Sequence, residues 1–176
     1  METKTEDYRN ELFYQPKNGY DRIDTEERLV MEQYAEEYKK FLNEARTERE
    51  AVKLAVEMAE AQGFVPYERG MEMAPGTKIY FNNRGKSLIL AVMGEQPLEN
   101  GCVIAGAHVD APRLDLKQQP LTEQDELAYF RTHYYGGIKK YQWVTIPLEL
   151  HGVVVLQSGE TVDVVIGRDP EDPQLV

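Results

Sequence analysis

Apolar residues recur every three or four positions in two consecutive stretches, a spacing that predicts two amphipathic helices. The first stretch spans residues 24–44, and the second follows Thr47; both carry charged residues on the opposite face. Asp24 is a plausible N-cap for the first helix. Thr47 and Glu50 form a stronger capping-box pattern for the second, and Gly63 provides a left-handed stop. We interpret both helices as structural.

After residue 63 the period changes to that of β-structure. Residues 78–81 and 87–93 are β-prone runs joined by residues 82–85, whose Asn and Gly tolerate the positive φ angles of a tight hairpin. Residues 102–107 are then apolar without alternation, which is typical of a strand buried on both faces of a helix-covered sheet. Together these elements predict an α/β layer with a mixed sheet.

From Arg113 onward short β-prone segments dominate, and no helical period returns. The segments lie around residues 114–116, 127–132, 148–156 and 162–166. Residues 118–126 are polar, and we expect a mobile loop there. The change of character places a domain boundary near residues 112–118, which gives domains 1–112 and 113–176.

Charge and composition narrow the classes of partner. The sequence holds 31 acidic and 20 basic residues, a formal charge of -11 that repels phosphate backbones and anionic lipid. We therefore expect no nucleic-acid and no membrane partner, and we interpret Lys139-Lys140 and the aromatic residues near it as a packed hairpin. No apolar run reaches the roughly 20 residues of a membrane helix, which favours a cytoplasmic location. Cys102 is expected to be a buried, reduced thiol.

The residues best suited to chemistry are His108 and Asp110, at the end of the apolar run. Ligands bind outside the carboxyl ends of strands in open α/β sheets. Residues two apart in extended chain point to the same side, so the Asp110 carboxylate could orient a metal-binding His108. It could instead help to turn the chain before Pro112. The pattern is short, and a hydrogen-bonded structural histidine is the alternative interpretation.

A wider set of residues resembles one family. The runs are residues 47–51, 82–87, 104–116, 132–138 and 151–155. Together they resemble the M18 family of zinc aminopeptidases over nearly the whole chain. The resemblance implies a zinc-exopeptidase-like mixed sheet with helices, incomplete here, followed by the start of an inserted, mostly β domain that makes subunit contacts. It also implies peptide substrates and a homo-oligomer.

The same resemblance implies a dinuclear site that holds two Zn²⁺, with Co²⁺ or Mn²⁺ as possible substitutes. In it His108 is a metal ligand, and Asp110 is the catalytic-site carboxylate that orients it. The other ligands and the general base are expected after residue 176, so we expect this portion to be inactive alone. The alternative is a non-catalytic truncated product or a subunit-contact module. His133 and His151 match no ligand position and are interpreted as structural.

Overall fold

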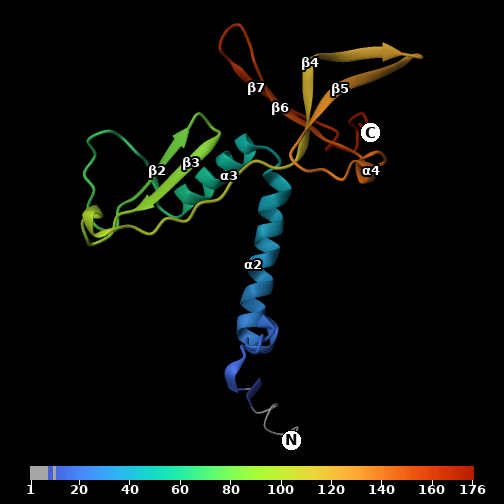
Figure 1. The fold of residues 1–176 in the computed structure, drawn as a ribbon. Helices are drawn as coiled ribbons and strands as arrows, with labels where there is room; N and C mark the ends of the chain where they lie inside the picture. Colours follow the sequence, from blue (N-terminus) through green and yellow to red (C-terminus); the bar gives the residue numbers. More distant parts are fainter. Residues whose placement is uncertain (1–7, 10) are drawn as a thin grey trace, which may run out of the picture. The chain divides into compact units, whose positions relative to one another are not determined.

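The computed structural model describes residues 8, 9 and 11–176 and divides into two compact units, Met1–Leu42 and Asn43–Val176 (Figure 1). The first unit holds the short 3-10 helix η1 (Gly19–Asp21) and most of α2 (Thr25–Glu44). The N-cap prediction for α2 is confirmed. The Glu27 amide donates to Asp24 Oδ1 at 2.8 Å, and the Asp24 amide donates to Glu27 Oε2 at 3.1 Å, so two amides at the helix start are satisfied reciprocally.

The second unit begins with α3 (Glu48–Ala61), whose predicted ends are also confirmed. The Thr47 hydroxyl accepts from the Glu50 amide at 3.3 Å, and the Glu50 carboxylate accepts from the Thr47 amide at 2.8 Å. At the other end Gly63 adopts a φ of +83° and its amide donates to the Glu60 carbonyl. Glycine suits this left-handed position because it has no Cβ to clash.

A three-stranded sheet follows in the order β1-β2-β3. It consists of β1 (Val65–Pro66), β2 (Lys78–Asn83) and β3 (Ser87–Val92). β1 runs parallel to β2, and β3 runs antiparallel to it, so the sheet is mixed as predicted, although its parallel strand is β1 and not the predicted run at residues 102–107. Arg84 and Gly85 turn the hairpin with φ of 58° and 67°. No sequence pattern predicts β1, because two residues are too few to show a period.

One face of this sheet packs against α3. The Tyr80 hydroxyl donates to the Glu60 carboxylate across that contact, at 2.7 Å. Among the described residues, only Ala51, Val52 and Ala59 are buried, and all three belong to α3. The core of the second unit is therefore small.

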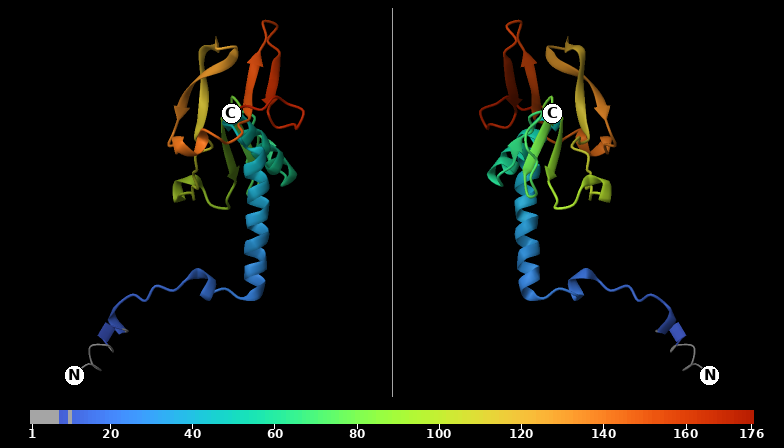
Figure 2. Two further views of the ribbon diagram at one scale, coloured as in Figure 1. Left: turned by 90° about the vertical axis from the view of Figure 1, so that its right-hand side faces the viewer. Right: turned by 90° about the vertical axis from the view of Figure 1, so that its left-hand side faces the viewer.

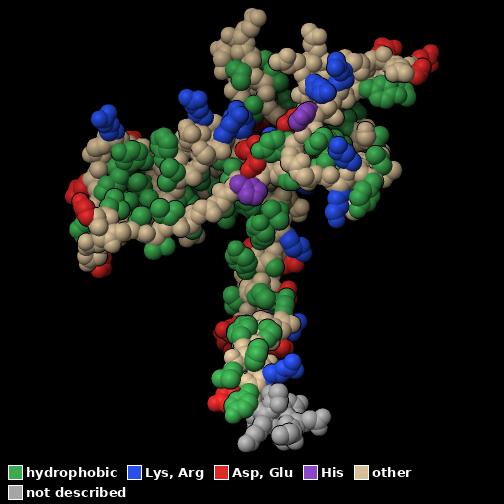
Figure 3. Space-filling model, in the orientation of Figure 1, with side chains coloured by type: hydrophobic (Ala, Val, Ile, Leu, Met, Phe, Trp, Pro, Cys, Tyr) green, Lys and Arg blue, Asp and Glu red, His purple; other side chains and the backbone are tan. Residues whose placement is uncertain are grey.

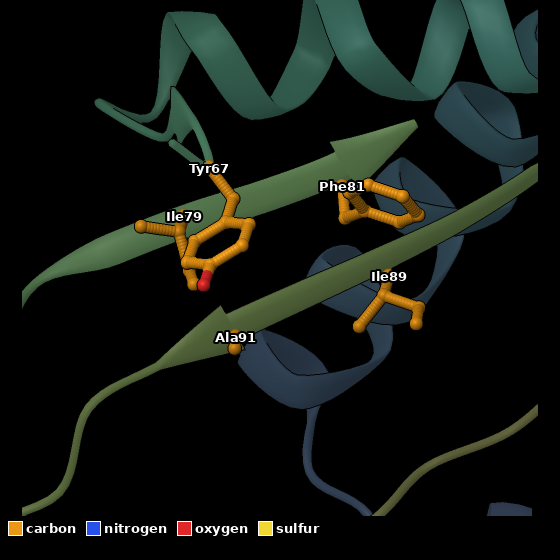
Figure 4. A pocket seen from close by; sticks show the side chains of 5 residues that line it. All are labelled: Tyr67, Ile79, Phe81, Ile89 and Ala91. Carbon is orange, nitrogen blue, oxygen red and sulfur yellow. The ribbon is translucent and has the colours of Figure 1, made fainter. Parts of the chain in front are cut away.

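The other face of the sheet is apolar and open. Side chains from β2, β3 and the residue after β1 line a hollow of about 360 Å³: Tyr67, Ile79, Phe81, Ile89 and Ala91 (Figure 4). Hydrophobic side chains also gather over the β2–β3 hairpin in the space-filling view (Figure 3). The Phe81 and Ile89 side chains of this face are 49% and 64% exposed. Much apolar surface thus lacks a covering layer.

The strand predicted at residues 102–107 is wrong. The segment between η2 (Leu98–Asn100) and residue 113 forms no strand, and the Val103 and Ile104 side chains are 101% and 84% exposed. Cys102, which we expected to be buried, is an exposed free thiol. A strand buried on both faces requires neighbouring strands on its edges. No strand in the described part of the chain pairs with this run, so its apolar residues remain in solvent.

The predicted loop at residues 118–126 is also wrong, because most of it lies in β4 (Arg113–Gln124). β4 pairs antiparallel with β5 (Leu127–Tyr135), with one register shift inside β4. Asp125 and Glu126 form the two-residue turn between them, with φ of 54° and 63°. Two consecutive positive φ angles are typical of a tight hairpin turn. Polar composition predicts a loop here, but a two-stranded ribbon that is exposed on both faces needs no alternation of apolar and polar residues.

The last elements are α4 (Lys140–Trp143), β6 (Leu150–Val155) and β7 (Thr161–Ile166). The two strands confirm the prediction; α4 contradicts the expected lack of helix, because one turn is too short to show a period. The predicted aromatic hairpin is correct only in part: Tyr134 and Tyr135 lie on β5, with Lys140 over the Tyr134 ring, whereas Tyr141 lies on α4 and is 74% exposed. β6–β7 and β4–β5 are separate two-stranded sheets (Figure 2). Among the described helices, none has the length and apolar character to cross a membrane.

Candidate functional site

His108 and Asp110 lie together, as their spacing predicted, although no strand carries them. The His108 Nδ1 atom is 2.7 Å from the Asp110 carbonyl oxygen and 3.1 Å from Asp110 Oδ1. Both oxygens are acceptors, so these contacts favour the tautomer with the proton on Nδ1. The His108 side chain is 81% exposed. Nε2 is then an unprotonated nitrogen on an accessible ring, which is the form that ligates metal.

The second Asp110 oxygen is held from β5. The Tyr135 hydroxyl donates to Asp110 Oδ2 at 2.7 Å. This bond is the main cause that lowers the pKa of Asp110 below its ordinary value, and the bond from His108 contributes less. The same bond raises the pKa of Tyr135. Asp110 is therefore held as a carboxylate, with His108 on one oxygen and Tyr135 on the other.

Arg113 supports the Tyr135 ring. Its guanidinium carbon lies 4.2 Å from the ring centroid, a cation–π geometry. Arg113 is itself held by two carboxylates: Nε is 2.7 Å from Asp115 Oδ1, and Nη1 is 3.2 Å from Glu48 Oε1 in the first turn of α3. The strand register explains the contact between the Arg113 guanidinium and the Tyr135 ring, because the two residues are direct partners at the base of the β4–β5 hairpin.

These residues fit part of a zinc site. An accessible imidazole whose other nitrogen is fixed by a carboxylate is suited to one zinc ligand. Within residues 8, 9 and 11–176, however, no three histidine, cysteine or acidic side chains converge on a point that could hold a metal ion. Among the described residues, His108 is therefore a candidate for a single ligand, and Asp110 is the group that contacts its other nitrogen.

His151 and His133 have structural surroundings. The His151 side chain is only 6% exposed, with Nδ1 2.7 Å from Glu50 Oε1 and Nε2 2.8 Å from Glu149 Oε2. Burial alone would raise the pKa of Glu50, but the hydrogen bonds from His151 and Thr47 outweigh it and lower that pKa. His133 stacks on Tyr134, with ring centroids 5.5 Å apart. Both observations agree with the structural interpretation of these histidines.

The sequence reasoning did not find Tyr135 and Arg113 as members of the site. The sequence pattern places Tyr135 only among the aromatic residues near Lys139-Lys140, without a role of its own. The signal that could have found Tyr135 is the pairing of β4 with β5. This pairing places Tyr135 opposite Arg113, and Arg113 follows Asp110 by three positions. That register was hidden because the turn of the hairpin fell within a segment we interpreted as a loop.

Comparison with known proteins identifies the class to which these features belong. Residues 41–176 match the family model described as aminopeptidase I zinc metalloprotease (M18). A probable M18 family aminopeptidase 1 from Clostridium acetobutylicum is 45% identical over 168 residues, which are 93% of this chain and 36% of the relative. The corresponding protein of Borrelia garinii is 42% identical over 160 residues, covering 91% of this chain and 35% of the relative.

Solved structures agree. The crystal structure of aminopeptidase I from Borrelia burgdorferi B31 superposes with a TM-score of 0.84 at 40% identity, covering 90% of this chain and 39% of that one. The M18 aminopeptidase structure from Thermotoga maritima gives a TM-score of 0.81 at 40% identity, with 92% and 35% covered. The chain belongs to the M18 family of zinc metalloproteases. It spans little more than a third of the length of these relatives.

Proposed function

We propose that this chain contributes His108 as a metal ligand, and Asp110 as its orienting carboxylate, to the two-zinc site of an aminopeptidase that hydrolyses N-terminal residues from peptides. The observation that supports it best is the His108 ring, held by Asp110 at one nitrogen and exposed at the other. When bound, zinc supplies Lewis-acid chemistry toward water and the scissile carbonyl.

The residues of this chain have the following roles in that proposal. Asp110 accepts hydrogen bonds from the Nδ1–H group of His108, through its carbonyl oxygen and Oδ1, which fixes the tautomer and makes Nε2 a better electron donor. Because the Asp110 pKa is lowered, the group remains an acceptor at neutral pH and does not compete with His108 as a donor. The aspartate therefore acts through the histidine and holds its ring in the liganding orientation.

We further propose that the active form includes more polypeptide than these 176 residues, which would be inactive alone. Three features support this: a single candidate ligand among the described residues, an uncovered apolar sheet face, and the exposed run at residues 102–107. The additional polypeptide would place strands beside residues 102–107 and a layer over the open face of the sheet, and would so bury both apolar surfaces. The same additional polypeptide would supply the remaining metal ligands.

Residues 113–176 remain our proposal for the opening of an inserted β domain that makes homo-oligomer contacts. The two hairpins in this region are each only two-stranded, so their outer edges carry unpaired backbone groups. Such ribbons are marginally stable by themselves, and open edges readily pair with another chain. Subunit contacts along these edges would pair the open backbone groups and stabilise the two hairpins.

A hybrid protein tests the proposal. Residues 1–176 replace the matched region of the Clostridium acetobutylicum relative, and hydrolysis of short peptides is measured with added zinc, beside the 176-residue chain alone. We expect turnover by the hybrid and none by the chain. Turnover by the chain alone would contradict the need for further ligands. A folded, zinc-loaded hybrid without turnover would favour the non-catalytic alternative.

A further inference from the structure

We propose that Tyr135 is a positioning residue for the metal-binding histidine: its hydroxyl fixes the Asp110 carboxylate, which in turn fixes the His108 ring. This inference rests on the proposed function, because it assigns Tyr135 a role in the same site. It adds a residue from β5 to a pair that comes from the segment before β4. The order of contacts is Tyr135, Asp110, His108.

The two oxygens of Asp110 are shared between two donors. Oδ1 lies 3.1 Å from His108 Nδ1 and adds to the 2.7 Å contact of Nδ1 with the Asp110 carbonyl oxygen. Oδ2 accepts from the Tyr135 hydroxyl at 2.7 Å. A carboxylate held at one oxygen can still rotate about its side-chain bond, whereas bonds to both oxygens leave it one orientation. The Tyr135 bond is the shorter of the two and is charge-assisted. It is therefore the contact that sets where Oδ1 points.

The position of the hydroxyl is itself determined by the contacts of the Tyr135 ring. Arg113 covers one face of the Tyr135 ring, and Glu48 and Asp115 hold the guanidinium. The Arg113 contact holds the ring through its face, so the hydroxyl at the ring edge remains available to donate to Asp110. Removing only the hydroxyl should therefore leave the ring where it is, which makes Tyr135→Phe a clean perturbation.

The chain after Tyr135 also fixes this approach. Gly136 has a φ of +72°, and a Cβ built on it would lie 3.5 Å from the Pro112 Cα atom. The end of β5 thus passes close to the residue two positions after Asp110. The positive φ favours a glycine here, and the close passage brings Tyr135 within reach of the carboxylate.

The test needs a readout that does not depend on turnover. Nitrogen-15 NMR of the imidazole in the 176-residue chain, at a pH where His108 is neutral, reports which ring nitrogen carries the proton. We expect mainly the Nδ1–H form in the unaltered chain. In Tyr135→Phe we expect a smaller share of that form, because only the contact with Asp110 Oδ1 is weakened and the 2.7 Å contact of Nδ1 with the Asp110 carbonyl oxygen remains. Tyr134→Phe is the matched control, since it removes the hydroxyl of the neighbouring residue on the opposite face of β5 and should change nothing.

An unchanged His108 spectrum in Tyr135→Phe would overturn the proposal, as would an equal change in Tyr134→Phe. In the hybrid with the Clostridium relative, Tyr135→Phe should weaken zinc binding about tenfold, at the lower end of what loss of a ligand's hydrogen-bonded support costs. Unchanged zinc affinity there would also overturn it.

Failure of the proposed function gives a different result. A His108→Ala hybrid that keeps its full zinc content would show that His108 is not a ligand, whatever the tautomer measurement gives. Conversely, if His108→Ala loses zinc but Tyr135→Phe changes neither zinc affinity nor the tautomer, only the role of Tyr135 is refuted.

Discussion

Replacing His151 by alanine should release the β6–β7 hairpin from α3. The imidazole bridges Glu50 of α3 and Glu149 just before β6, and its side chain is 6% exposed. Each ring nitrogen contacts one carboxylate, Nδ1 at 2.7 Å and Nε2 at 2.8 Å. Hydrogen bonds to charged groups contribute about 1.5–3 kcal/mol each. We take the lower value for both, because each carboxylate is partly exposed, at 28% and 29%, and regains water when the ring is removed. The expected loss is about 3 kcal/mol.

Hydrogen exchange of the β6 and β7 amides measures this loss locally, without requiring the chain to unfold in one step. A loss of about 3 kcal/mol corresponds to exchange faster by roughly a hundredfold. His133→Ala is the matched control, because His133 is an exposed strand histidine and its replacement should stay within about 0.5 kcal/mol. If exchange in His151→Ala matched that of the control, the bridge would carry no stability and our interpretation of it would be wrong.

Three further predictions concern α3. Thr47→Ala removes half of the capping box and should destabilise the helix by about 1 kcal/mol, seen as faster exchange in its first turn, whereas Thr47→Ser should be nearly neutral. Val52→Ala truncates the most buried side chain among the described residues, at 1% exposure. It should lower the urea midpoint of unfolding by an amount equivalent to about 2 kcal/mol of unfolding free energy. An unchanged midpoint would show that α3 does not pack on the sheet. The pKa of Glu50 is lowered from its ordinary value of 4.5, so its contribution is present above that value and is lost as the pH falls through the lowered pKa. The stability difference between the unaltered chain and Glu50→Gln should shrink on acidification below about pH 4.5, and a constant difference would contradict the bridge.

The sequence predicted best those features that depend on neighbours in the chain. The capping box at Thr47 and Glu50 and the left-handed Gly63 are local, and both are as expected. The β2–β3 hairpin follows from turn residues between two short apolar runs. The pair His108 and Asp110 belongs to this group too, since two residues in extended chain suffice to bring their side chains together.

The errors concern features that depend on distant parts of the chain or on other polypeptide. The apolar run at 102–107 has the composition of a central strand, but a strand exists only where neighbours pair with it, and composition carries no information about them. The polar ribbon of β4 and β5 is the reverse case, because pairing forms a strand where composition indicated a loop. Tyr135 was missed for the same reason: its contact with Asp110 crosses 25 residues and requires the register of that ribbon.

The most direct test of the central claim is the zinc content of the hybrid protein after His108→Ala, compared with His133→Ala in the same protein. We expect His108→Ala to lose bound zinc and peptide hydrolysis together, since a metal ion loses a direct ligand, while His133→Ala keeps both. Full zinc content and unchanged turnover in His108→Ala would contradict the assignment of this histidine to the metal site.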